Sequence, residues 1–351
     1  MNLRNYRTSI IIAVTFTVLL STFWYLQQLA FIVFLSLLLQ LLLHPLVDRL
    51  SQKMPRGLAA GLVILAFILL SVLVFVLVSR SVIPNLTKFT RDFPVLMEGL
   101  QQNIAMHDVS SYLNDEADGL LDEVKSAALT ALKSSVSMLF SLFGSIIDLV
   151  IIFFVTFYLL KDGNSIKNYL AGLFPHRDYG RVLALFDRIL SALRTYICSQ
   201  LIICCLTATV VLLYFTLRGL PYGPVFAMVS GIAEFVPVLG PTVASCFGTL
   251  LTATNGLGLA AQTAGFYLIL TQINHNVVYP TLIGKSLNLH PISIILGIVL
   301  GGELLGPAGM FLAVPFIVIC KLVIEDIYAN RLKQNECLAL SRWLVHERKD
   351  S

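Results

Sequence analysis

Residues 57–79 read GLAAGLVILAFILLSVLVFVLVS and contain no charged side chain. A helix of about 20 such residues crosses the roughly 30 Å hydrocarbon core of a membrane. The whole chain of 351 residues shares this character, with 57% hydrophobic and 13% charged residues and a mean hydropathy of +0.84. A single core in water cannot bury so much apolar surface, so the sequence predicts an integral membrane protein.

Further apolar runs accompany this one, and together they predict an all-α polytopic membrane fold with about eight transmembrane segments. The other runs are residues 9–24, 29–43, 138–160, 197–217, 224–252, 259–283 and 291–320. The first run looks like a signal peptide, but a second run follows almost at once and no small-x-small site closes the first. We therefore expect a retained helical hairpin at the N-terminus.

The distribution of lysine and arginine predicts the orientation of these segments. If the N-terminus is cytoplasmic, most of the 24 basic residues fall in segments on the cytoplasmic side. Basic residues near the ends of membrane spans favour that side. We therefore expect both termini in the cytoplasm.

Changes in composition divide the chain into six expected segments. They are three N-terminal transmembrane helices (residues 1–82), an extracytoplasmic helical insertion (83–137), a fourth transmembrane helix (138–160), a cytoplasmic amphipathic segment (161–196), a C-terminal transport core with broken helices (197–325) and a cytoplasmic tail (326–351). Lys161-Asp162-Gly163 is expected to end the fourth helix, because a cation suits the negative helix end and glycine accepts a left-handed cap.

Two of these segments carry polar patterns with more than one interpretation. The insertion holds an acidic cluster that suits a divalent cation or, more simply, a solvated face, formed by Asp115, Glu116, Asp118, Asp122 and Glu123. The cytoplasmic segment predicts a short amphipathic helix with apolar positions Leu183, Phe186, Ile189, Leu190 and Leu193. Its Arg181, Arg188 and Arg194 suit anionic lipid headgroups, although positive-inside bias alone explains them equally well.

Glycine and proline accumulate in the last third of the chain, where they break the apolar runs. The interruptions are Gly223-Pro224, Pro237, Leu239-Gly240-Pro241, Pro280, Pro291, Gly301-Gly302, Leu305-Gly306-Pro307 and Pro315. Proline removes a backbone donor and clashes with the preceding turn, and lipid cannot satisfy the freed carbonyl groups. These segments should therefore be broken or re-entrant helices that face protein or water. A weak internal repeat relates the segment from Glu234 to Pro241 to the segment from Glu303 to Pro307.

Three carboxylates lie at membrane depth on this map: Asp148, Glu234 and Glu303. A lone buried carboxylate is costly when ionised, and it binds a proton or a cation instead. Each acid could alternatively cap a half-helix or lie at the membrane interface. We favour a capping or interfacial role for Asp148. We favour a coupling-ion role for Glu234 and Glu303, because glycine and proline breaks surround them.

A polar run precedes Tyr279-Pro280 and comprises Gln272, Asn274, His275 and Asn276. It could line a permeation path with His275 as a proton relay, although a hydrogen-bonded interfacial histidine explains the pattern equally well.

The usual signatures of catalysis are absent from the sequence. It contains no CxxC, HExxH, GxSxG, P-loop or GxGxxG pattern, so we expect no enzyme activity, no cofactor and no resident metal. The net charge of +4 is too dispersed for nucleic-acid binding.

Several motifs resemble those of the autoinducer-2 exporter (AI-2E) family of bacterial permeases, over about residues 10 to 325. They are Phe157 to Asp162, Glu234 to Pro241 (EFVPVLGP), Pro280 to Ser286, Leu289-His290-Pro291 and Gly306 to Pro315. The resemblance implies a polytopic inner-membrane protein with about eight spans that works as a homo-oligomer in the lipid bilayer. It also implies transport of a small polar signalling molecule, or exchange of sodium or lithium for protons, with Glu234 at the family's acidic position. Where many relatives place acidic residues before the Tyr-Pro step, this chain has Asn274 and His275.

The leading hypothesis is therefore a secondary permease that exports a small hydrophilic solute across the bacterial inner membrane. Its expected substrate or ion path comprises Glu234, Pro237, Gly240, Pro241, Asn274, His275, Asn276, Glu303, Gly306 and Pro307. The alternatives are a monovalent cation/proton antiporter that uses the same site and a non-transporting membrane scaffold whose partner binds the insertion.

Overall fold

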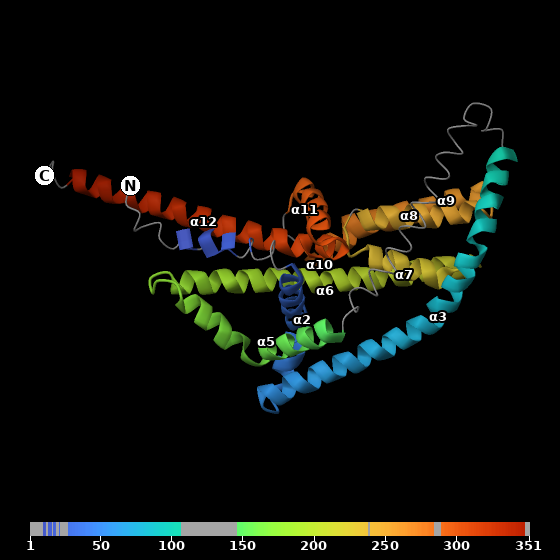
Figure 1. Cartoon of the computed structure of the whole chain (residues 1–351). Helices are drawn as coiled ribbons and strands as arrows, with labels where there is room; N and C mark the ends of the chain where they lie inside the picture. Colours follow the sequence, from blue (N-terminus) through green and yellow to red (C-terminus); the bar gives the residue numbers. More distant parts are fainter. Residues whose placement is uncertain are drawn as a thin grey trace. The chain divides into compact units, whose positions relative to one another are not determined.

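The structure is a computed structural model that describes residues 27–106, 146–237, 239–283 and 289–347, with single positions between 10 and 21. Every element in these ranges is helical, as Figure 1 shows. The helices are α2 (Gln27–Leu50), α3 (Arg56–Met106), α5 (Ile146–Gly172), α6 (Tyr179–Leu217), α7 (Gly223–Ala233), α8 (Leu239–Ala253), α9 (Leu257–Ile273), η3 (Asn274–Val278), α10 (Tyr279–Ile283), α11 (Pro291–Leu305) and α12 (Pro307–Glu347).

The prediction of an all-α polytopic membrane protein is confirmed. Within the described ranges, four helical stretches are long and apolar enough to cross a membrane: Gln28–Leu50, Arg56–Phe89, Tyr179–Leu217 and Ala308–Arg331. The shorter apolar helices α7, α8 and α11 belong to the part of the chain that is rich in glycine and proline.

The expected break at Leu305-Gly306-Pro307 is present, since Gly306 separates α11 from α12 within the run 291–320. One expected boundary was wrong: Lys161-Asp162-Gly163 does not end a helix, since α5 continues to Gly172. Glycine inside a helix costs only about 1 kcal/mol relative to alanine, and the residues that follow Gly163 continue the helical hydrogen bonding.

The chain divides into two compact units. The first unit comprises Met1–Gly61, Val150–Arg194 and Leu289–Ser351, and the second comprises Leu62–Leu149 and Thr195–Asn288. The six-segment division remains a prediction. The acidic cluster expected between residues 115 and 123 lies outside the described residues.

Aromatic side chains from four helices form the core of the second unit. Phe89 of α3, Phe215 of α6, Phe226 of α7 and Phe247 of α8 are all buried. Phe215 and Phe226 stack with ring centroids 4.7 Å apart, and Phe89 contacts Phe226 and Phe247 edge-on. Such pairs stabilise a core beyond the area that they bury. The second unit thus holds the short helices α7 and α8 in a well-packed frame.

Glycine brings α11 and α12 together as a tight hairpin in the first unit. Gly306 has φ +60° and ψ −143°, a conformation that L side chains rarely adopt, and it forms the turn. A Cβ at Gly301 would overlap the carbonyl of Gly309, and a Cβ at Gly309 would overlap the carbonyl of Gly301. The two backbones are therefore in direct contact.

The predicted amphipathic helix exists as the first part of α6, but its apolar face packs against protein. Leu183, Phe186 and Ile189 adjoin a buried cluster of Ala171, Val182 and Val323. The guanidinium of Arg181 donates to the Asp326 carboxylate at 2.6 Å, and Arg188 lies 3.4 Å from Glu325. Two of the three arginines expected at lipid headgroups thus pair with acids of α12.

Candidate functional site

Glu234 lies at the end of α7 and is only 2% exposed. Residues 234–237 form the break between α7 and α8, and Pro237 is buried within it. The chain closes this break tightly: the Gly240 amide donates to the Val236 carbonyl at 2.9 Å, and a Cβ at Gly240 would overlap the Ala233 carbonyl. The glycine and proline break therefore holds a carboxylate inside the second unit.

Three side chains from neighbouring helices contact Glu234. The Thr207 hydroxyl of α6 and the Asn274 amide of η3 each donate to Glu234 Oε1 at 3.0 Å. The Gln200 amide of α6 donates to the Glu234 main-chain carbonyl at 2.6 Å. Helix ends leave carbonyl groups without helical partners, so Gln200 satisfies one that α7 leaves open. We call Gln200, Thr207, Glu234 and Asn274 the Glu234 cluster.

The cluster contains more oxygen acceptors than donors. Glu234 Oε2, Gln200 Oε1 and Asn274 Oδ1 are buried and have no hydrogen-bond partner among the described residues. The Tyr279 hydroxyl is a further donor beside both Glu234 and Gln200, although it lies beyond hydrogen-bond distance of the three unpaired oxygens. No lysine, arginine or histidine in the described ranges forms an ion pair with Glu234. Buried polar atoms normally have partners, so an unpaired oxygen set of this kind calls for a proton, a cation or water.

The π-helical turn η3 places one residue of the polar run inside the protein and the next two on its surface. Asn274 is 2% exposed and faces the cluster, whereas His275 and Asn276 are exposed. His275 stacks on Tyr279 at 5.5 Å, and Asn276 donates to Gln272 at 2.8 Å. Single π-helical turns inside helices occur frequently at functional sites.

The remaining predicted site residues lie in different places. Pro237 and Gly240 are buried in the break beside Glu234, and Pro241 lies in the first turn of α8. Glu303 belongs to the first unit, where it is an exposed residue of α11. Gly306 forms the turn after it, and Pro307 begins α12.

Sequence reasoning missed Gln200 and Thr207. Their spacing of seven residues puts them on one face of α6, and both lie within the apolar run 197–217. Polar side chains on one face of a membrane span were the available signal. No group of three or more His, Cys, Asp or Glu side chains able to hold a metal ion occurs in the described part of the chain.

Apolar helices that break around a buried, hydrogen-bonded carboxylate are typical of polytopic membrane transport proteins. The comparison with known families agrees with this class, since the model of the AI-2E family transporters matches residues 10–329. The chain belongs to that family, which confirms the resemblance found in the sequence.

Bacterial proteins with transport-related names are similar to this chain. A Bacillus subtilis (strain 168) protein provisionally named transport protein YrrI is 26% identical over 69% of this chain and 70% of its own length. A second from the same strain, YueF, is 28% identical over 54% of this chain and 53% of its own length. The Escherichia coli (strain K12) protein provisionally named permease PerM is 26% identical over 59% of this chain and 60% of its own length. The chain therefore matches little more than half the length of YueF and PerM.

Proposed function

We propose that this protein is a secondary transporter that exchanges a monovalent cation for a proton at the Glu234 cluster. One observation carries the proposal: Glu234 is buried with two donors on Oε1, while Oε2 and two neighbouring amide oxygens are unpaired. A proton on Oε2 would neutralise the carboxylate, and a small hard cation would gain oxygen ligands there. Competition between the two for one carboxylate would couple their movements.

This preference reverses the ranking reached from the sequence, where solute export came first. A hydrophilic solute needs a roomy polar site. The members of the Glu234 cluster, by contrast, are at most 3% exposed and hydrogen-bonded to one another. A dehydrated ion or a proton suits such closely packed oxygens better. The family's role in membrane transport supports either cargo.

Sodium-driven proton flux tests the proposal directly. The full-length protein is reconstituted in proteoliposomes with an internal pH dye, and sodium or potassium chloride is added outside. We expect a sodium-dependent pH change that Glu234→Gln abolishes, since glutamine keeps the shape of the side chain but does not titrate. Glu325→Gln is the matched control, because it removes a half-exposed carboxylate of α12 and should leave the flux unchanged.

Two results would contradict cation exchange. Sodium-dependent flux that persists in Glu234→Gln would remove Glu234 from the coupling path. The absence of any sodium-dependent signal in the unmodified protein would exclude sodium–proton exchange altogether.

Export of a small hydrophilic solute is the second candidate, favoured by the polar side chains exposed at the end of α9 and on η3. Gln272, His275 and Asn276 are exposed on a helix whose neighbouring Ile269, Ile273 and Val277 are exposed and apolar. Polar groups facing lipid are costly, so a wet route would explain them. Uptake of autoinducer-2 into inside-out vesicles, compared between the unmodified protein and Asn276→Leu, tests this candidate. Equal uptake by both would count against it.

A further inference from the structure

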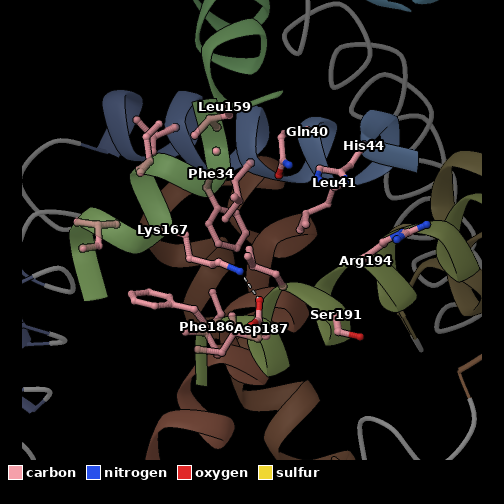
Figure 2. Close-up of a pocket in the computed structure, with 18 of the residues that line it drawn as sticks. Phe34, Gln40, Leu41, His44, Leu159, Lys167, Phe186, Asp187, Ser191 and Arg194 are labelled. Carbon is pink, nitrogen blue, oxygen red and sulfur yellow. Dashed lines mark hydrogen bonds and ion pairs between the residues drawn. The ribbon is translucent and has the colours of Figure 1, made fainter. Parts of the chain in front are cut away.

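The first unit contains a large cavity of about 890 Å³ that the Glu234 cluster does not use. Helices α2, α5, α6 and α12 line it, as Figure 2 shows. Its size falls within the range of about 300–1,000 Å³ that is typical of small-molecule sites. Most of the lining is apolar, with contributions from Val33, Phe34, Leu37, Leu159, Leu170 and Phe186.

The ionisable side chains that line the cavity are mostly basic. His44, Lys167 and Arg194 face one acid, Asp187. Lys167 Nζ and Asp187 Oδ1 are 2.7 Å apart, so this pair is internally neutralised, and Figure 2 shows the two side chains pointing toward each other. Arg194 is exposed and has no acidic partner among the described residues. The cavity therefore carries an excess positive charge.

The unpaired charge lies at one side of the cavity, where Figure 2 shows Arg194 and His44. His44 Nδ1 lies 2.7 Å from Asp48 Oδ2, and Arg56 Nη2 lies 3.3 Å from Asp48 Oδ1. These two groups therefore have an acidic partner, and Arg194 supplies the excess charge. Gln40 and Ser191 also line the cavity and offer hydrogen-bond donors. A long apolar surface thus ends beside unpaired positive charge and neutral donors.

We propose that this cavity binds one anionic phospholipid. Its acyl chain would lie against the apolar side chains of α2 and α5, and its phosphate would lie at Arg194, beside Gln40 and Ser191. The charge complementarity favours an anionic over a zwitterionic headgroup, because Arg194 has no carboxylate partner in the described part of the chain. The basic segments that surround the site are those predicted to face the anionic cytoplasmic leaflet. This inference does not depend on the proposed ion exchange.

Native mass spectrometry of the full-length protein tests the proposal. Phosphatidylglycerol or phosphatidylethanolamine with identical acyl chains is titrated into the detergent-solubilised protein. We expect one phosphatidylglycerol per chain to be retained in preference to phosphatidylethanolamine. Arg194→Ala should weaken phosphatidylglycerol binding about fivefold, the contribution of one basic residue near anionic lipid, and leave phosphatidylethanolamine binding unchanged.

Two further variants separate this site from general lipid adhesion. Arg188→Ala removes a basic residue of the same helix that pairs with Glu325 and does not line the cavity, so it should not change lipid binding. Leu37→Trp should fill part of the apolar lining and reduce the binding of either lipid. Equal retention of the two lipids, or equal effects of the Arg194 and Arg188 substitutions, would overturn the proposal. So would the absence of retained lipid, which would mean that the chain itself fills the cavity.

Discussion

Replacing Gly309 with alanine tests whether α11 and α12 meet through their backbones. A Cβ at Gly309 would overlap the carbonyl of Gly301 and would lie 2.8 Å from Leu305 Cβ. Because the main obstacle is main chain, no side-chain rotation can relieve it, and the helices must separate. Overpacking costs about 3 kcal/mol at the upper end of its usual range. Alanine regains about 1 kcal/mol of helix propensity. We therefore expect a net loss of about 2 kcal/mol of stability.

The apparent Tm of the detergent-solubilised protein, followed by size-exclusion chromatography after heating, measures this loss. Gly163→Ala is the matched control in the same unit, because no atom beyond the backbone of its own helix lies within 4 Å of a Cβ at Gly163. It should stabilise α5 by up to about 1 kcal/mol. A Gly309→Ala protein as stable as the Gly163→Ala protein would refute the direct backbone contact.

The remaining predictions concern the contact between α6 and α12 and the start of α7. Arg181→Ala should destabilise the packing of α6 on α12 by about 2–3 kcal/mol, since it leaves the 13% exposed Asp326 side chain without its charged donor. Hydrogen exchange near Val323 should rise, whereas Arg188→Ala should change stability by less than about 0.5 kcal/mol because its pair is exposed. Burial and the hydrogen bond to Asp92 raise the pKa of Tyr222 to about 12. This pKa lies above the unfolded-state value of about 10. The stabilisation that the neutral Tyr222 side chain gives the fold is therefore complete below about pH 10, and it is lost as the pH rises toward 12. Alkaline melting curves should therefore fall more steeply for the unmodified protein than for Tyr222→Phe, and identical curves would contradict this.

Composition and periodicity predicted the class of fold because lipid imposes a strong constraint on sequence. Long uncharged runs such as residues 57–79 can satisfy their backbone groups in a membrane only as helices or closed barrels. The positions of helix ends were predicted less well. Gly306 ends α11 at the predicted break, whereas Gly163 continues a helix that it was expected to end. The difference arises from tertiary contacts, since α11 must turn back to place Gly301 against Gly309.

The candidate site was only partly visible in the sequence. Glu234 stood out because it is a charged residue among breaks, and Asn274 because it belongs to a polar run. Which residue of that run faces inward depends on the extra residue in the π-helical turn, and ordinary helical periodicity does not contain it. Gln200 and Thr207 were missed because single polar residues within a span do not reveal which distant helix they contact.

Glu234 connects the end of α7 to α6 and to η3, and it does so through both its main-chain carbonyl and its carboxylate. Its main chain is bound to Gln200 of α6, and its side chain is bound to Thr207 of α6 and Asn274 of η3. A displacement of η3 relative to α6 would break the Asn274 contact at the carboxylate and leave the bonds from Gln200 and Thr207, which both come from α6. The end of α7 is therefore attached to α6 through both its main chain and its side chain, but to η3 through the side chain alone. A change of charge on the carboxylate would reach η3 through Asn274.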